Sequence, residues 1–221
     1  MAAASENLAY VLGSALYLNI TNACTLSCQF CPKVRDNDWT IGGFDMRLAK
    51  NPTANEVWNA ALSVGLQQHS EVVFTGFGES TRRFDVLIDL TQRLKRAGVR
   101  RVRLDTDGLA NLREQRDVVP ELSRSGLDAI SVSLNATDAA TYARICPNRY
   151  GEAAWHAARD FIRLAVQQLP EVTVSFVGVA ELDEAECRSV AESLGAHFRW
   201  RPYQQKMEIL PSASAEFLHH R

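Results

Sequence analysis

Short apolar stretches alternate with amphipathic stretches along most of this 221-residue chain. The apolar stretches have the length of strands, and the stretches between them follow the helical period of about 3.6 residues. The expected strands are residues 15–20, 71–75, 99–106, 127–135, 171–177 and 197–201. The expected helices are residues 53–69, 84–96, 118–125, 139–144, 153–168 and 183–194. Alternation of this kind predicts an α/β fold with a parallel sheet and right-handed crossovers.

Six such units fit a partial (β/α)6 barrel of the TIM type, with a doubly wound, flavodoxin-like sheet as the alternative. Helices cover every strand, yet one phase of most strands is polar, as in the alternation of Arg103 and Asp105 with apolar neighbours. The other polar residues on this phase are Tyr17, Asn19, Arg101, Ser131, Ser133, Asn135, Thr173, Ser175, Arg199 and Arg201. Unpaired polar groups are costly in a packed core. We therefore expect a polar lumen that binds a polar ligand, the alternative being an open sheet with one solvated face.

Three cysteines follow the first expected strand in the spacing C-x3-C-x2-C, at Cys24, Cys28 and Cys31. Thiolates select zinc, copper(I) or iron–sulfur clusters. A structural zinc site needs four ligands, and no fourth cysteine or histidine lies nearby in the sequence. Three thiolates suit a [4Fe–4S] cluster with one iron left open, while a zinc knuckle or a chance group of buried thiols is the alternative.

This cysteine loop resembles that of the radical SAM superfamily, in which S-adenosylmethionine (SAM) chelates the open iron through its amino and carboxylate groups. The resemblance implies that Phe30 lies beside the SAM adenine. The turn after the second expected strand resembles the Gly-Gly-Glu-like motif of that superfamily. Gly76, Gly78 and Glu79 are then expected to hold the SAM amino group, although Phe77 departs from the motif.

Polar residues at the ends of the third and fourth expected strands extend the resemblance. Ser131, Ser133 and Asn135 match the positions that contact the SAM ribose and the methionine carboxylate. The turn at residues 105–108 resembles a Thr-Asn-Gly turn, with Asp107 in place of the asparagine. In α/β barrels, active sites lie at these carboxyl ends of the strands.

A narrower resemblance is to the small radical SAM proteins encoded beside TatD-type nucleases, a family without an established substrate. The phrases that carry it are residues 18–22, 76–79, 105–109, 131–136, 144–146 and 199–203. On this basis we expect a radical SAM partial barrel over residues 15–203. Residues 1–14 are expected to form an N-terminal extension, and residues 204–221 a C-terminal tail.

Catalytic candidates beyond the cofactor contacts are Cys146, Arg103 and Arg201. Cys146 is expected on the active-site side, where it could donate a hydrogen atom or serve as a structural thiol, whereas Cys187 is expected in the core. Arg103, Arg199 and Arg201 share the lumen phase and should need anionic compensation there. We hypothesise that the substrate carries a carboxylate or phosphate that these arginines bind. The alternative is that they pair with glutamates on neighbouring loops.

The composition of the chain limits the classes of partner and the cellular compartment that we expect. A formal net charge of −2 gives no electrostatic signal for nucleic acid or an anionic membrane. No apolar run approaches the ~20 residues that span a bilayer, and residues 1–14 lack the features of a secretory signal. Cysteines clustered in one loop are typical of a metal site rather than a disulfide framework, so we expect a cytoplasmic protein.

Taken together, these features predict an enzyme that cleaves SAM reductively to methionine and a 5′-deoxyadenosyl radical, which abstracts hydrogen from a substrate. A flavodoxin or ferredoxin is the expected reductant. The substrate can be a small molecule or a polypeptide, and the sequence does not indicate an oligomeric state. The alternatives are an activating enzyme of the glycyl-radical type, acting on a partner protein, and a non-catalytic metal-binding module.

Overall fold

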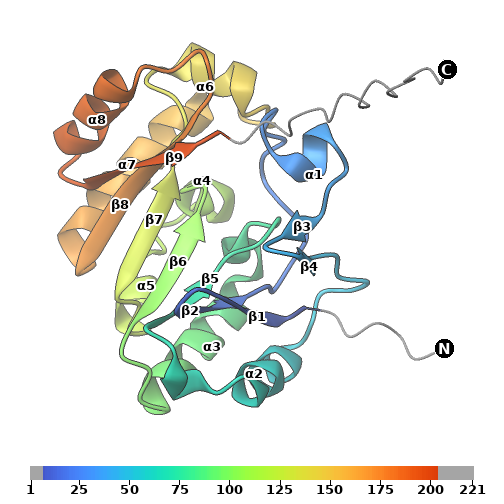
Figure 1. Cartoon of the computed structure of the whole chain (residues 1–221). Helices are drawn as coiled ribbons and strands as arrows, with labels where there is room; N and C mark the ends of the chain where they lie inside the picture. The colour runs from blue at the N-terminus through green and yellow to red at the C-terminus, as the bar shows by residue number, and fades with distance from the viewer. Residues whose placement is uncertain (1–6, 204–221) are drawn as a thin grey trace, which may run out of the picture.

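The computed structural model describes residues 7–203, and its centre is a seven-stranded sheet (Figure 1). The strands lie in the order β1-β2-β5-β6-β7-β8-β9. Their bounds are β1 (Ala9–Leu12), β2 (Ala15–Leu18), β5 (Glu71–Phe74), β6 (Val102–Thr106), β7 (Ala129–Ser133), β8 (Glu171–Gly178) and β9 (His197–Pro202). From β2 to β9 every neighbouring pair is parallel, so the predicted six-stranded parallel sheet is confirmed.

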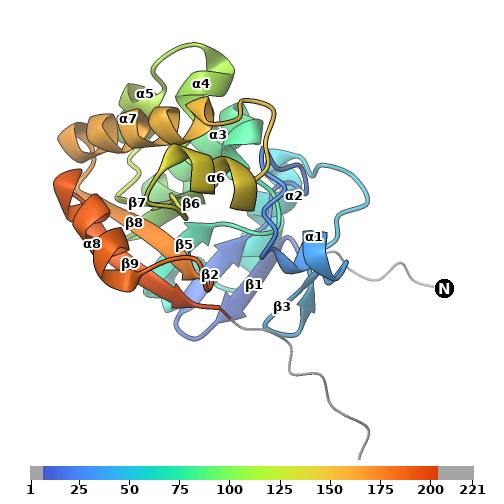
Figure 2. The same cartoon turned by 90° about the horizontal axis from the view of Figure 1, so that it is seen from above.

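The parallel strands lie beside one another in chain order, which decides between the two expected architectures. A flavodoxin-like sheet reverses its winding at a switch point, and this sheet does not. Viewed from above, the sheet is curved and its helices lie along the outer side (Figure 2). The edge strands β1 and β9 do not pair with each other. The fold is therefore a partial barrel of the kind predicted.

Helices follow the strands and cover their apolar phase. The longer ones are α2 (Ala54–Ser63), α3 (Phe84–Arg96), α7 (Ala153–Gln168) and α8 (Glu184–Ser193). The shorter ones are α1 (Pro32–Arg35), α4 (Ala110–Glu114), α5 (Val119–Arg124), α6 (Ala139–Ile145) and the 3-10 turns η1 (Leu66–Gln68) and η2 (Ser80–Arg83). Leu104 and Val132 of the sheet, Leu87 of α3 and Phe161 of α7 are all fully buried in one core. Burial of these apolar side chains stabilises the fold and leaves the polar strand phase facing inward.

Strand β1 was not expected, because residues 9–12 were assigned to the N-terminal extension. It pairs antiparallel with β2 after a short turn and becomes an edge of the sheet. Tyr10 holds it in place, since this ring is only 2% exposed and stacks on Tyr17 with a centroid distance of 5.4 Å. A strand of four residues is too short to show a convincing alternation in sequence.

Two further segments differ from the expectation. The helix expected over residues 53–69 ends at Ser63, because Gly65 takes a left-handed conformation with φ +81° and a 3-10 turn follows it. The segment before Pro52, expected as a linker, contains α1 and the hairpin of β3 (Thr40–Ile41) and β4 (Phe44–Asp45). The expected tail at 204–221 lies outside the described residues. Within residues 7–203 no helix is long and apolar enough to cross a membrane.

The start of α2 provides a test of the fold. Thr53 Oγ1 accepts from the Glu56 amide, and the Glu56 carboxylate accepts from the Thr53 amide, so a reciprocal capping box starts this helix. We expect Thr53→Ala to lower the free energy of unfolding by about 1 kcal/mol, because backbone donors of the first turn lose their partner. Equilibrium urea denaturation measures this loss. As a control, Ser63→Ala at the exposed end of α2 should stay within about 0.5 kcal/mol of the parent; equal losses in both variants would contradict the capping role.

Candidate active site

A cavity of about 520 Å³ lies inside the curved sheet. Its wall is built from the cysteine loop, the turn after β5 and the polar phase of β6 to β9. Its lining includes Cys24, Cys28, Cys31, Phe30, Gly76, Gly78, Glu79, Arg103, Asp105, Asp107, Ser131, Ser133, Asn135, Ser175, Arg199 and Arg201. The predicted polar lumen is thus confirmed, and the residues expected to hold a cluster and SAM border one space.

The cysteine loop connects β2 to α1 and is anchored by backbone hydrogen bonds. The Ser27 amide donates to the Pro147 carbonyl and the Gln29 amide to the Ile145 carbonyl, each at 2.9 Å. These two bonds flank Cys28 and join the loop to the end of α6 and the segment that follows it. The cysteines are therefore carried by a loop whose backbone is fixed against the barrel rather than free in solvent.

The thiols themselves are only partly exposed, and none is in a disulfide. Burial raises the pKa of Cys24 to about 12. A hydrogen bond with the Cys146 thiol, together with burial, raises the pKa of Cys28 well above its usual range. Free thiolates are disfavoured in such surroundings. A bound metal centre would supply the positive charge that stabilises them.

The arrangement of the thiols bears on which metal centre they could hold. No three Cys, His, Asp or Glu side chains among residues 7–203 lie close enough together to hold one metal ion. A closed tetrahedral zinc site is therefore not present in this arrangement. An iron–sulfur cluster can take each thiolate on a different iron, so its ligands need not converge on one point. Three cysteines bordering one cavity fit such a cluster.

The turn after β5 approaches the end of β2 very closely. A Cβ atom at Gly78 would lie 2.0 Å from the Thr21 carbonyl oxygen, so only glycine fits. Glu79 is buried and links this turn to the end of β6. Its carboxylate accepts from the Thr81 amide at 3.0 Å, the Thr106 hydroxyl at 2.8 Å and the Asp107 amide at 2.7 Å. Much of its acceptor capacity is thus used within the protein.

Asp107 is a polar cavity residue to which we assigned no cofactor contact from the sequence. It is 5% exposed, and its Oδ2 atom has no hydrogen-bond partner among the described residues. Burial and the neighbouring Glu79 raise its pKa well above the usual range. Its Oδ1 atom accepts from the Leu109 amide at 2.9 Å, but a buried carboxylate oxygen without a partner is costly and favours a cationic ligand group nearby. The signal in the sequence was an acid at the carboxyl end of a parallel strand.

The three arginines of the lumen phase separate into two groups. Arg103 bonds to both oxygens of Glu71 at 3.2–3.3 Å and to Asp105 at 2.5 Å. Arg103 is therefore paired with acids of the protein itself, which was the alternative to substrate binding, although these acids lie on strands rather than loops. Arg199 and Arg201 form no ion pair in the described part of the chain. Arg201 instead donates to Ser133 at 3.3 Å and to Asn135 at 3.4 Å.

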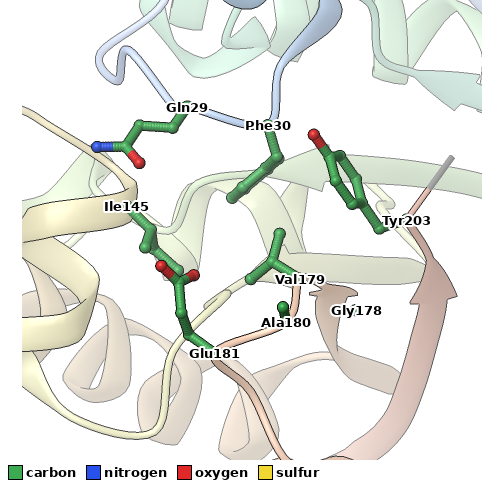
Figure 3. A pocket seen from close by; sticks show the side chains of 8 residues that line it. All are labelled: Gln29, Phe30, Ile145, Gly178, Val179, Ala180, Glu181 and Tyr203. Carbon is green, nitrogen blue, oxygen red and sulfur yellow. The ribbon is translucent and has the colours of Figure 1, made fainter. Parts of the chain in front are cut away.

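A second cavity of about 470 Å³ adjoins the first (Figure 3). Phe30 lines both cavities, with the Tyr203 ring beside it in Figure 3. The end of β8 and the loop after it, residues 178–181, form one wall, and we expected no site residue there from the sequence. Its position at the carboxyl end of a barrel strand was the available signal.

The two remaining cysteines are both fully buried. Cys187 lies in the core on α8, as expected. Cys146, at the end of α6, lines neither of the two cavities described above. Its thiol contacts Cys28 rather than open space. This position does not favour hydrogen-atom donation from Cys146 to a molecule in the cavity.

Several solved structures of other proteins have a fold similar to that of this chain. HydG, a maturase of the [FeFe]-hydrogenase, aligns with a TM-score of 0.64 and 14% identity over 89% of this chain and 43% of its own. Streptococcus suis SuiB bound to the precursor peptide SuiA aligns with a TM-score of 0.62 and 17% identity, over 86% of this chain and 39% of SuiB. A radical SAM methyltransferase from Sphaerobacter thermophilus aligns with a TM-score of 0.58 and 20% identity, over 88% of this chain and 57% of the methyltransferase. These similarities show the fold.

Sequence relatives include a GTP 3′,8-cyclase of Synechococcus elongatus, 29% identical over 179 residues, which are 80% of this chain and 50% of the relative. A probable GTP 3′,8-cyclase of Saccharolobus islandicus is 30% identical over 59% of this chain and 37% of its own. The chain thus spans about half the length of the curated relatives it matches, or less. The family model described as "Radical SAM superfamily" matches residues 18–194, and the chain therefore belongs to the radical SAM superfamily.

Proposed function

We propose that this protein is a radical SAM enzyme whose Cys24, Cys28 and Cys31 hold a [4Fe–4S] cluster at the wall of the main cavity. Members of this superfamily bind such a cluster and SAM. The observation that carries the proposal is the shared cavity, since the cysteine loop and the expected SAM contacts border one space. When bound and reduced, the cluster supplies the electron that cleaves SAM to methionine and a 5′-deoxyadenosyl radical. The electron would come from a flavodoxin- or ferredoxin-type reductant.

The polar groups of the cavity suggest how SAM would be oriented. Glu79 and Asp107, whose Oδ2 atom has no partner among the described residues, lie on the side of the cysteine loop, where they would favour the SAM ammonium group. Ser131, Ser133 and Asn135 would contact the ribose and the methionine carboxylate. This arrangement would place the amino-acid part of SAM beside the cluster.

Phe30 borders both cavities, which supports a location for the adenine. We propose that the adenine lies against Phe30 in the second cavity, near the loop after β8, while the rest of SAM occupies the main one. The protein's contribution is then to orient SAM and to keep water away from the reacting carbon.

The substrate is proposed to be a molecule that enters the main cavity. The similar curated proteins are named as GTP 3′,8-cyclases, but this chain spans at most half of their length, so that activity does not transfer on similarity alone. The narrower resemblance to TatD-linked proteins stays a prediction.

Cysteine substitution tests the cluster site. After anaerobic reconstitution, the parent protein should hold about four irons and four sulfides, which are the contents of one [4Fe–4S] cluster. Cys24→Ala, Cys28→Ala and Cys31→Ala should each lose the cluster, because each removes one of three thiolate ligands. Iron and sulfide analysis with the visible absorbance spectrum measures this loss.

Cys187→Ala is the control, since it removes a more deeply buried thiol away from the cavity and should retain the cluster. Stoichiometric zinc with no uptake of iron in the parent protein would contradict the assignment.

Substitution of the expected SAM contacts tests the orientation. Adding SAM to the reduced, reconstituted protein should change the EPR spectrum of the cluster. Glu79→Gln and Ser133→Ala should require several-fold more SAM for the same change, with the iron content preserved. Ser193→Ala on the exposed part of α8 should behave like the parent. SAM titrations that coincide for all four proteins would show that the placement is wrong.

A further inference from the structure

Two guanidinium groups in the main cavity are not neutralised by any acid in the described part of the chain. Arg199 and Arg201 lie on the same face of β9, one strand repeat apart, and both line the cavity. Asp105 interacts electrostatically with both, but it already bonds to Arg103 at 2.5 Å. Glu71 is likewise occupied, because it bonds to both Arg101 and Arg103. Neither Arg199 nor Arg201 therefore has an ion-pair partner of its own among the described residues.

Burial makes the charge of Arg201 costly, whereas Arg199, on the same strand face, is exposed. The Nε atom of Arg201 is buried without a hydrogen-bond partner among residues 7–203, and its two long contacts go to neutral oxygens. Burial lowers the pKa of Arg201, the direction expected when a cation loses hydration without gaining a counter-charge. Burial also raises the pKa of Asp105 despite the arginines around it, which weakens the one acid they share.

A second unpartnered donor borders the same space. Tyr10 on β1 has a buried hydroxyl with no hydrogen-bond partner in the described residues. Burial raises its pKa, so the hydroxyl stays protonated and able to donate. The cavity is thus bordered by unused donors on its two edge strands, at Tyr10 and Arg201, and by an unused acceptor at Asp107. Buried polar groups are nearly always paired in native proteins, which indicates a missing ligand.

We propose that Arg199 and Arg201 bind an oxyanion, a carboxylate or phosphate group, of the substrate. The inference rests on the proposed function, because it assumes that the cavity holds a substrate beside SAM. Guanidinium groups bind such anions through paired, charge-assisted hydrogen bonds. The substrate is then a small anionic molecule whose charged group lies against β9 while its reacting carbon faces the SAM site.

SAM carries a carboxylate of its own, which is the competing source of the same chemistry. A single carboxylate makes a paired contact with one guanidinium group, so a second anionic group is needed to engage the exposed Arg199 together with Arg201. The assignment predicts that Arg199 contributes little to SAM affinity, whereas Arg201 acts on SAM only through Ser133 and Asn135. This difference separates the two sources.

The test measures anion binding directly by calorimetry. Inorganic phosphate and acetate are titrated into anaerobically reconstituted, SAM-saturated protein at low ionic strength. We expect one of the two probes to bind the parent protein at one site, with Arg199→Gln and Arg201→Gln each weakening that affinity about tenfold or more. Arg201→Lys should restore only part of it, because lysine keeps the charge but not the paired geometry. If Arg201→Gln does not fold, Arg199→Gln and Arg201→Lys still provide the comparison.

Arg163→Gln on the exposed side of α7 removes an equal charge outside the cavity and should leave anion affinity unchanged. SAM affinity of all variants is measured in parallel and should stay within about twofold of the parent for Arg199→Gln and Arg163→Gln. Arg201→Gln also removes the hydrogen bonds to Ser133 and Asn135, so its SAM affinity should fall no further than that of Ser133→Ala. A tenfold loss of SAM affinity in Arg199→Gln, or equal anion affinity in parent and cavity variants, or binding of neither probe, would overturn the proposal. Because calorimetry needs no turnover, failure to cleave SAM would count against the proposed function alone.

Discussion

The constraint on which this structure depends is the inward-facing polar phase of β6 to β9. The apolar side chains of these strands pack against α3, α7 and α8, so the side chains of the opposite phase must face the interior of the barrel. An interior lined by serine, asparagine, aspartate and arginine cannot close into a dry core without leaving polar groups unpaired. The sheet instead remains an open, partial barrel around a cavity of about 520 Å³. The fold and its capacity to bind a polar ligand therefore have the same cause.

The charges in that cavity are distributed unevenly. Buried carboxyl groups at Glu79 and Asp107 lie on the side of the cysteine loop, and the uncompensated arginines lie on β9. Backbone hydrogen bonds around Cys28, and Lys33 donating to the Phe77 carbonyl at 2.8 Å, join the cysteine loop to its neighbours. A zwitterionic cofactor and an anionic substrate could both be accommodated by such a distribution, each against the side of opposite charge.

The local pattern of the sequence was sufficient to predict the six parallel strands and their polar phase, because both depend on side-chain periodicity. It was not sufficient to predict contacts that depend on the register between strands distant in the sequence. Arg103 meets Glu71 only because β5 and β6 pair with Val73 opposite Arg103, which no local pattern specifies. Strand β1 was missed since its stability comes from pairing with β2 and from the Tyr10–Tyr17 contact. The residue roles expected from the family resemblance remain predictions.

The most direct measurement is formation of 5′-deoxyadenosine from SAM. Reconstituted protein is incubated anaerobically with SAM and a strong chemical reductant, and the products are quantified by liquid chromatography and mass spectrometry. The account predicts 5′-deoxyadenosine and methionine in equal amounts, abolished in Cys28→Ala and preserved in Cys187→Ala. Absence of 5′-deoxyadenosine from protein with a complete, reduced cluster and bound SAM would contradict it.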